Sequence, residues 1–413
     1  MTETTLYERL LGIERPWQVC DVRLALEQGD VEVGVEFVGE TLVCPACGAA
    51  CPGYDRRRRT WRHLDTMQYR TLVWAEVPRV RCAEHGVQQV RVPWADARAR
   101  FTALFEAMVI DWLAVASFEA VARQCRLSWD QVSGIQERAV RRGLSRRAVA
   151  ASPVVGVDET SFQRRHEYVT VVNDLTASEP RVLYVADGRN RAAIDGYFEA
   201  VGEEGCALIT MVAMDMWQAY IGSVQEHTEA LIAFDKFHVA QHLGAAVDQV
   251  RRSENRELRQ QGDDRLVKTR YLWLTRRGNM TRRQQREFTP LRTSTLRVAR
   301  AWAIKESAMQ LWNYRSRGWA ERMWKRWYGW AIRSRLEPVK KVARMIKRHW
   351  DGVIDAVLTN VTNARSEATN AKIQWIKRLA CGYRNRERFR NAIYFHLGGL
   401  DLYPDALAAH TKS

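Results

Sequence analysis

The sequence predicts an α/β protein whose mixed sheet carries a large all-helical insertion and is preceded by a small cysteine-containing β module and a helical segment. Two observations predict the sheet and its insertion. Short apolar, β-rich runs alternate with helical segments between residues 153 and 234, and no strand pattern appears between His238 and Trp350. Paired cysteine and histidine residues before residue 90 predict the small module. The chain has 413 residues, 46% of them hydrophobic, which is enough for the cores of several domains.

Composition excludes several classes of protein. The net charge is +16 and the pI is near 9.7. No stretch approaches the roughly 20 uncharged apolar residues that a membrane span needs, which excludes a membrane protein. Residues 1–5 show neither the basic nor the apolar part of an export signal, so we expect a cytoplasmic chain with reduced cysteines. Eight Cys are too few for a disulfide scaffold, so clustered cysteines are interpreted as metal ligands.

The first two segments are a mixed N-terminal stretch, residues 1–40, and a cysteine module, residues 41–95. The module contains two knuckles with the same two-residue gap, Cys44-Pro45-Ala46-Cys47-Gly48 and Cys82-Ala83-Glu84-His85-Gly86, separated by 34 residues. Three thiolates and one imidazole on two tight turns complete a closed tetrahedral site. We therefore predict a zinc ribbon with structural Zn²⁺ on Cys44, Cys47, Cys82 and His85. Cys51 and, more weakly, His63 remain alternative ligands.

Residues 96–150 are predicted to form a helix-turn-helix DNA-binding domain. Residues 117–125 suit one helix, residues 127–130 a short turn, and residues from 131 onward a second helix that Ser128 can cap. An ordinary helical hairpin has the same local pattern, but the neighbouring ribbon and a basic block favour DNA binding. The second helix carries side chains suited to a groove and its phosphates: Gln131, Ser133, Gln136, Arg138, Arg141 and Arg142.

Residues 151–243 are predicted as the first part of an α/β core in the order β-β-β-α-β-α-β. Asp158 and Asp215 each follow an apolar strand, so both carboxylates meet at one edge if the first and fourth strands are neighbours. A close pair of carboxylates attracts Mg²⁺ or Mn²⁺, and a third would complete a two-metal site for phosphodiester chemistry. A single aspartate at a strand end is more often a loop cap. Asp235 is a further candidate of the same kind.

Residues 244–362 are predicted as a helical, basic, Trp-rich insertion. From Gly244 to Trp350 the chain has 28 Lys and Arg against 9 Asp and Glu, a net charge of +19 within a chain of +16, and 8 of the 16 Trp. Basic side chains interleaved with large aromatic rings suit a surface that neutralises phosphates and stacks on bases. A solvated helical face over a Trp-filled core is the alternative for most of these Trp. The charge excess favours a nucleic acid partner.

These motifs resemble bacterial insertion-sequence transposases of the ISL3 family along nearly the whole chain. The supporting features are the Cys-Pro-x-Cys-Gly knuckle, the helix-turn-helix, and the blocks Val-Gly-Val-Asp-Glu (155–159) and Phe-Asp-Lys-Phe-His-Val (234–239). The most specific signature is Asn-Ala-Arg-Ser-Glu-Ala-Thr-Asn (363–370), followed by Ile-Lys-Arg (376–378) and Gly-Tyr-Arg-Asn (382–385).

The resemblance implies a ribonuclease-H-like core completed by residues 363–413, and a catalytic triad of Asp158, Asp215 and Glu367 that binds Mg²⁺ or Mn²⁺. The implied activity is DNA cleavage at the terminal inverted repeats of the element, followed by strand transfer into target DNA. Pairing of two ends implies a homodimer. The implied location is the bacterial cytoplasm, on the nucleoid when bound to DNA. Near Glu367 in the sequence, a further basic group is expected to clamp the DNA backbone: Lys377, Arg378 and Arg384.

Other functions remain open at this stage. A DNA-binding regulator would use the same ribbon and helix-turn-helix but would not need carboxylates at two strand ends and at Glu367. A structure-selective nuclease on the same fold would cut DNA without joining it. Ala368 stands where Gly is frequent in the family, which is compatible with an inactive copy, although no position of the triad is lost.

Overall fold

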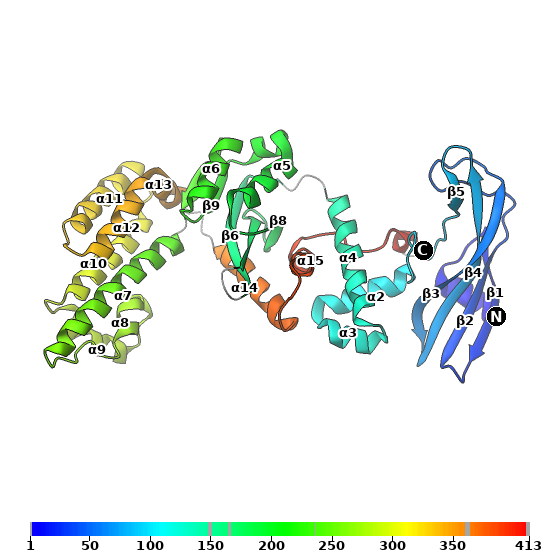
Figure 1. The fold of residues 1–413 in the computed structure, drawn as a ribbon, viewed down its shortest axis with the longest axis horizontal. Helices are drawn as coiled ribbons and strands as arrows, with labels where there is room; N and C mark the ends of the chain where they lie inside the picture. The colour runs from blue at the N-terminus through cyan, green and yellow to red at the C-terminus, as the bar shows by residue number, and fades with distance from the viewer. Residues whose placement is uncertain (1, 148–150, 164–166, 235, 360–363, 410–413) are drawn as a thin grey trace. The chain divides into compact units, whose positions relative to one another are not determined.

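A computed structural model describes residues 2–147, 151–163, 167–234, 236–359 and 364–409, except for the side chains of residues 364, 365, 367, 408 and 409. The chain divides into two compact units, Met1–Ala148 with Ile376–Ser413, and Val149–Trp375. Figure 1 labels the helices and strands of each unit. In the described part of the chain, no helix is long and apolar enough to cross a membrane.

The first unit contains a five-stranded sheet in the order β1-β2-β4-β3, with β5 paired to β4. β2 runs parallel to β4, and the other pairs are antiparallel. The strands are β1 Trp17–Ala25, β2 Asp30–Phe37, β3 Gly53–Thr66, β4 Tyr69–Cys82 and β5 Gly86–Gln89, preceded by helix α1 Glu3–Leu11.

The N-terminal stretch belongs to the same domain as the cysteine module, which differs from the separate segments expected for residues 1–40 and 41–95. The alternating Val31, Val33 and Val35 of β2 are fully buried in one core with residues of β4. The apolar face that these valines form with β4 shares its core with Leu11 of α1 and with Trp94 after β5. The parallel pairing of β2 with a strand 40 residues later is not visible in any local sequence pattern.

Helices complete the first unit. They are α2 Ala103–Val115, α3 Phe118–Cys125, α4 Trp129–Arg146, α15 Arg386–Leu397 and the short 3₁₀ helix η3 Asp405–Ala409. α15 packs against α4, so the last part of the chain joins the helix-turn-helix unit. Residues beyond Trp375 group with the helix-turn-helix unit, and the role of residues 363–413 in completing the catalytic core stays a prediction.

The second unit contains a mixed sheet in the order β10-β9-β6-β7-β8. β6, β7 and β8 are antiparallel neighbours, whereas β6, β9 and β10 are parallel. The predicted order β-β-β-α-β-α-β is confirmed. The elements are β6 Val154–Gln163, β7 Glu167–Asp174, β8 Arg181–Asp187, α5 Arg191–Leu208, β9 Met211–Met214, α6 Gln218–His227 and β10 Leu231–Phe234.

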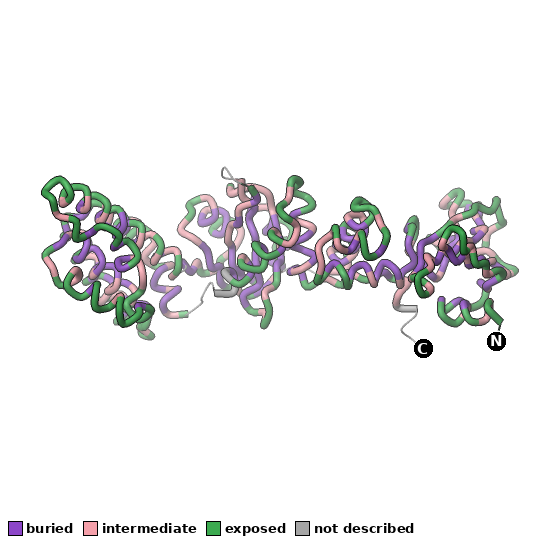
Figure 2. Tube along the Cα trace, turned by 90° about the horizontal axis from the view of Figure 1, so that it is seen from below, coloured by how far each residue is buried: buried purple, intermediate pink, exposed green. Residues whose placement is uncertain are grey.

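The described residues after β10 form helices, as predicted for the insertion. α7 runs without a break through the predicted boundary at residues 243 and 244. Buried residues of the insertion and of the sheet form one continuous core, and Figure 2 shows them inside the sheet and on the inner sides of the helices. The helices are α7 Lys236–Gln260, α8 Arg270–Leu274, η1 Arg277–Asn279, α9 Arg282–Arg292, α10 Arg297–Gln310, η2 Leu311–Asn313, α11 Arg317–Ile332, α12 Glu337–Arg348, α13 Trp350–Thr359 and α14 Ala364–Leu379.

Candidate functional site

The four predicted zinc ligands converge in the first unit. Their ligand atoms all lie within 4.8 Å of one another. Cys47 Sγ is 3.8 Å from Cys82 Sγ, and His85 Nδ1 is 3.9 Å from Cys44 Sγ and 3.6 Å from Cys82 Sγ. A tetrahedral zinc ion with bonds of about 2.3 Å to sulfur and about 2.0 Å to nitrogen keeps its ligands about 3.6 to 3.8 Å apart. The cluster therefore has the dimensions of a Cys₃His metal site.

Local backbone geometry explains why the knuckles form. Gly48 and Gly86 each follow the second ligand of their knuckle and have φ values of 72° and 65°. Glycine adopts this left-handed conformation at little cost, which allows each turn to close. The backbone amides of His85 and Glu84 lower the pKa of the Cys82 thiol to about 7, which favours the thiolate that a metal ion binds.

The two alternative ligands lie outside this cluster. His63 is buried, and its Nδ1 is 2.8 Å from Thr102 Oγ1, so its ring is held within the core of the unit. Cys51 Sγ donates to the Ala49 carbonyl oxygen, and burial raises the pKa of its thiol. His85, rather than Cys51 or His63, therefore completes the set of four.

The helix-turn-helix is formed by α3 and α4. Ser117 Oγ accepts a hydrogen bond from Ala120 N at the start of α3. Ser128 caps α4 as predicted: its Oγ accepts from Gln131 N at 3.2 Å, and its own N donates to Gln131 Oε1 at 2.7 Å. This reciprocal capping box fixes the entry into α4. The helix begins at Trp129, two residues before the predicted start.

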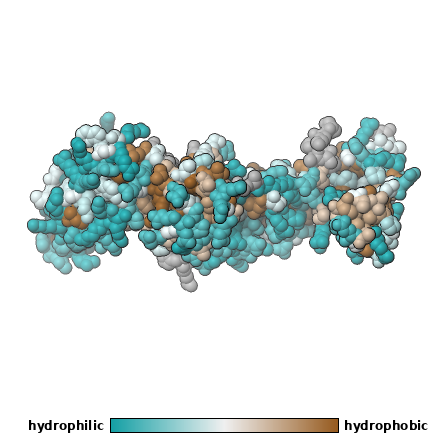
Figure 3. All heavy atoms as spheres, turned by 90° about the horizontal axis from the view of Figure 1, so that it is seen from above, coloured by the Kyte–Doolittle hydropathy of each residue, from teal (hydrophilic) through white to brown (hydrophobic). Residues whose placement is uncertain are grey.

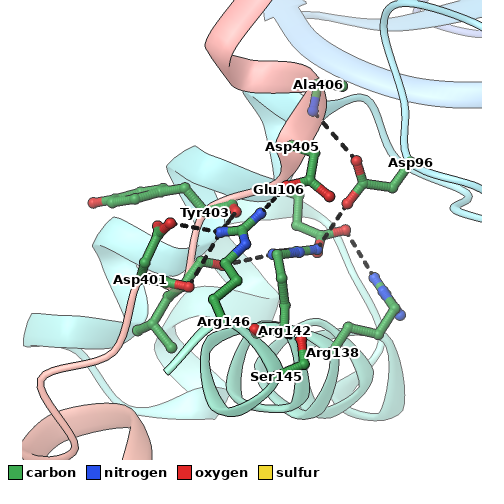
Figure 4. Close-up of polar contacts among 11 residues, drawn as sticks. Asp96, Glu106, Arg138, Arg142, Ser145, Arg146, Asp401, Tyr403, Asp405 and Ala406 are labelled. Atoms are coloured by element: carbon green, nitrogen blue, oxygen red, sulfur yellow. Dashed lines mark hydrogen bonds and ion pairs between the residues drawn. The ribbon is translucent and has the colours of Figure 1, made fainter. Parts of the chain in front are cut away.

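Three predicted DNA contacts on α4 point into the protein instead. Glu106 of α2 is only 2% exposed, and its two carboxylate oxygens accept hydrogen bonds from Arg138 at 3.0 Å and Arg142 at 2.8 Å (Figure 4). Gln136 is buried as well. Gln136 is therefore enclosed by the protein, and Arg138 and Arg142 both pair with the buried carboxylate of α2. A DNA contact by any of the three stays a prediction.

The remaining predicted residues of α4 lie at or near its surface. Arg141 is exposed and pairs with Glu137 one turn earlier. Gln131 is exposed, although its side chain also caps the helix, and Ser133 is half-buried. These three residues stay candidates for DNA contact.

The C-terminal segment is held against α4 by arginines, a feature that sequence reasoning missed. Arg142 donates to the Leu402 carbonyl oxygen at 2.5 Å and also pairs with Asp96. Arg146 pairs with Asp401 and Asp405, and Figure 4 shows both arginines reaching from α4 toward this segment. Residues 401–405 are therefore part of the helix-turn-helix unit.

In the second unit, the two predicted catalytic aspartates lie on neighbouring strands. Gly156 of β6 is in register with Ala213 of β9, so Asp158 and Asp215 each lie two residues further along parallel chains. β9 ends just before Asp215, as predicted, whereas β6 continues past Asp158 to Gln163. Asp158 is therefore inside a strand, at the point where its parallel partner ends. Each aspartate is half-buried.

α14 crosses β6 beside Asp158. Asn370 Nδ2 donates to Asp158 Oδ2 at 2.6 Å, and Gln374 Nε2 donates to Thr160 Oγ1 at 2.9 Å. A Cβ on Gly156 would lie 2.5 Å from Ser366 Oγ, so only glycine allows α14 this close. Ser366 is buried in the first turn of α14.

Glu367, the third predicted catalytic residue, lies in α14 one turn before Asn370. Its side chain is outside the described residues, as is the whole of Asp235. Asn370, the last residue of the 363–370 signature, is a site residue that the sequence analysis does not predict. Its spacing of three residues from Glu367, which places both on one side of a helix, is the signal that points to it.

Histidines of α7 flank Asp215. His238 Nδ1 is 3.9 Å from Asp215 Oδ2, and His242 Nε2 is 4.0 Å from Asp215 Oδ1. The i, i+4 spacing brings both imidazoles to the same side of α7. Lys236, at the start of α7, instead lies near the Trp312 ring, and burial lowers the pKa of its amine.

A second carboxylate, Glu159, follows Asp158 but points to the opposite face of the sheet, as strand alternation requires. Arg189 Nε donates to Glu159 Oε1 at 2.7 Å, and the same guanidinium lies 4.5 Å from the centroid of the Trp217 ring. Burial raises the pKa of Glu159, while the charge of Arg189 opposes this shift. Glu159 thus pairs with a cation on the face of the sheet opposite to Asp158.

The remaining predicted basic residues lie in the first unit or in the insertion. Lys377 and Arg378 end α14, and the exposed Arg384 precedes α15. Burial lowers the pKa of the half-buried Lys377.

In the insertion, most Trp side chains fill the core, as the alternative interpretation expected: Trp273, Trp302, Trp312, Trp324 and Trp327 are buried.

Comparison with protein families matches three consecutive parts of the chain. A zinc-finger model of insertion-sequence transposases matches residues 40–85, and the helix-turn-helix domain model of the ISL3 transposase family matches residues 90–140. The ISL3 transposase model itself matches residues 155–393, which include Asp158, Asp215 and Glu367.

Transposases from two other species are similar to this chain over most of its length. The transposase for insertion sequence element IS1557 from two strains of Mycobacterium tuberculosis is 29% identical over 422 residues, covering 93% of each chain. The transposase for IS1001 from Bordetella parapertussis is 28% identical over 356 residues, covering 85% of this chain and 87% of the relative. With the transposase model alone matching more than half of the sequence, this chain belongs to the ISL3 family of insertion-sequence transposases.

Proposed function

We propose that the second unit is a ribonuclease-H-like catalytic core that cleaves and joins DNA with a triad of Asp158, Asp215 and Glu367. The sheet supports this proposal, because three antiparallel strands are followed by two parallel strands on the other side of β6. The observation that carries it is the meeting of β6, β9 and α14, the three elements that hold the triad.

The donor set fits Mg²⁺. Asp158 and Asp215 offer carboxylate oxygens, which are the ligands that Mg²⁺ and Mn²⁺ prefer. Backbone amides of the following residues donate to one oxygen of each, at 2.8 Å and 2.7 Å. Because a carboxylate accepts at about four lone-pair positions, such bonds orient it and are compatible with cation binding. A cation bound there would activate the attacking hydroxyl and stabilise the leaving oxygen of a phosphodiester.

The surrounding residues position this site. Asn370 holds one oxygen of Asp158, and the close contact of Ser366 with Gly156 sets the distance between α14 and the strand. His238 and His242 place imidazole nitrogens around Asp215, where a DNA phosphate would lie. These groups fix the carboxylates before DNA arrives, which lowers the cost of ordering the site.

In the first unit, the Cys₃His cluster would hold a structural Zn²⁺, because all four positions of a tetrahedral ion are filled by protein and none is left for water. The ribbon and the helix-turn-helix would recognise the terminal inverted repeats of the element. Pairing of two ends would need two copies of the chain.

The test uses DNA from the flanks of the gene, incubated with the protein and Mg²⁺ or Mn²⁺. The wild type should cut at a defined terminus and join the end to a second DNA, and Asp158→Asn should do neither while still binding the end. Asp351→Asn, a change at an exposed carboxylate of the same unit, should keep activity. Specific binding without cleavage by the wild type would instead indicate a regulator or an inactive copy, and cleavage without joining would indicate a nuclease.

A further inference from the structure

The helix α11 presents two different faces. One face packs into the insertion through Ala320, Trp324, Trp327 and Ala331, all of which are buried. The i, i+4, i+7, i+11 spacing of these residues is that of an amphipathic helix. The other face is open to solvent.

The open face carries a stripe of two aromatic and three basic residues, which we call the α11 stripe: Trp319, Arg322, Arg326, Trp330 and Arg333. Their spacing of three or four residues keeps all five on one side of the helix. Trp319 is 55% exposed and Trp330 is 40% exposed, in contrast to the five buried Trp of the insertion. Hydrophilic residues dominate the surface of the insertion in the view of Figure 3.

The arginines of the α11 stripe are not used to hold the fold together. Among the residues that the structure describes, none of the three forms an ion pair with an acidic side chain. The Arg322 guanidinium lies 4.9 Å from the Trp319 ring centroid. Arg333 lies along the helix above Gly329, where a Cβ would come within 3.2 Å of its Nη2. The stripe also contains no acidic residue, so it forms a continuous cationic and aromatic surface.

We propose that the α11 stripe binds single-stranded DNA, by stacking unpaired bases on Trp319 and Trp330 while the three arginines contact phosphates. The chemistry favours this partner over duplex DNA. Bases of an intact duplex have no free face for an indole to stack on, whereas unpaired bases do. Eleven residues of α-helix span about 16 Å, so the two indoles are far enough apart to engage different nucleotides of one strand.

This inference rests on the proposed function in one respect, namely that the chain exposes single-stranded DNA next to a cleaved end. The insertion follows directly from the sheet that carries Asp215, since α7 begins two residues after β10 ends. A surface for single strands on this insertion would retain the freed strand after cleavage.

The experiment measures binding of the full chain to a fluorescein-labelled single-stranded oligonucleotide and to a duplex of the same length. Trp319→Leu combined with Trp330→Leu keeps apolar bulk but removes both rings, and should weaken single-strand binding about tenfold or more while changing duplex binding less than about twofold. The matched variant with Phe at both positions keeps stacking and should retain most of the affinity. A circular dichroism spectrum and a melting temperature equal to those of the wild type would establish that α11 is still folded.

Photo-crosslinking locates the contact directly. A single strand containing 5-iododeoxyuridine should form crosslinks that map to Trp319 or Trp330. The proposal is overturned if the Leu variant binds both DNAs as the wild type does, if it loses both equally, or if crosslinks map only elsewhere. End cleavage by the wild type is measured in the same preparation. If the wild type cleaves DNA ends but the α11 stripe makes no contribution to single-strand binding, this inference alone is refuted. If the stripe binds single strands but the wild type does not cleave DNA ends, the proposed function alone is refuted.

Discussion

The buried carboxylate of Glu106 offers a sharp test of how the helix-turn-helix unit is held together. Glu106→Gln changes one oxygen to an amide nitrogen with almost no change in volume. The amide can accept from one arginine only and turns its NH₂ group toward the other. Arg138 and Arg142 would both lose the negative charge that faces them. The helix α4 would therefore be held less firmly on α2.

The expected loss of stability in Glu106→Gln follows from the burial of the Glu106 carboxylate. Removing one partner of a buried ion pair costs about 3 to 5 kcal/mol. The Arg138 side chain is 36% exposed, and Arg142 keeps its pair with Asp96, so part of the lost interaction is compensated. We therefore expect a cost of about 3 kcal/mol, at the lower end of that range. Glu137→Gln is the matched control, because the Glu137–Arg141 pair on α4 is solvent-exposed and is worth about 0.5 kcal/mol or less.

Hydrogen exchange with mass spectrometry is the suitable assay, because it resolves one helix in a chain of two units. Glu106→Gln should speed exchange of the α4 amides about 100-fold, and residues 400–406 should follow because Arg142 holds them. Amides of β6 to β10 should not change. Equal exchange of α4 in the two variants, or an unchanged rate in Glu106→Gln, would refute the idea that this network holds the helix.

Three further predictions concern the zinc cluster and the candidate catalytic site. Cys82→Ser should abolish the bound zinc, about one ion per chain, whereas Cys51→Ser should keep it, as measured by metal analysis of the purified protein. Since the pKa of Cys82 is lowered to about 7, protons compete with the metal below that pH, and a chelator should remove zinc faster at about pH 6 than at about pH 8. Gly156→Ala should push α14 away from Asp158, cost about 1 to 3 kcal/mol and reduce cleavage more than about tenfold, with end binding unchanged. Adding Ser366→Ala removes the clashing oxygen, and a failure to recover any activity would show that the close contact is not the cause.

Features encoded by local pattern were predictable from the sequence. Alternating strands and helices gave the correct order of the α/β core, and Ser128 followed by Gln131 marked the start of α4. The two knuckles have tight turns of their own, so their residues could be identified before any contact between them was known. In each case the determining interactions lie within a few residues of one another.

Features that depend on distant contacts were not predictable. Gln136, Arg138 and Arg142 look like groove-facing residues as long as nothing covers α4, and the covering carboxylate, Glu106, stands 30 residues earlier in an apolar helix. The docking of residues 401–405 on Arg146 joins positions more than 250 apart. No periodicity or spacing in a single sequence specifies such a pair. The same limit applies to the parallel pairing of β2 with β4.

The first unit combines residues from before and after the second unit, and this arrangement dictates an order of assembly during synthesis. Val149–Trp375 is continuous and can fold as soon as the ribosome has released it. The helix-turn-helix unit must wait until α15 and residues 401–405 have been made, because α4 has no partner for Arg146 before then. A chain interrupted by a premature stop codon after Trp375 would therefore fold its sheet but leave α4 incompletely supported. Truncated products would compete poorly with the complete protein for DNA ends.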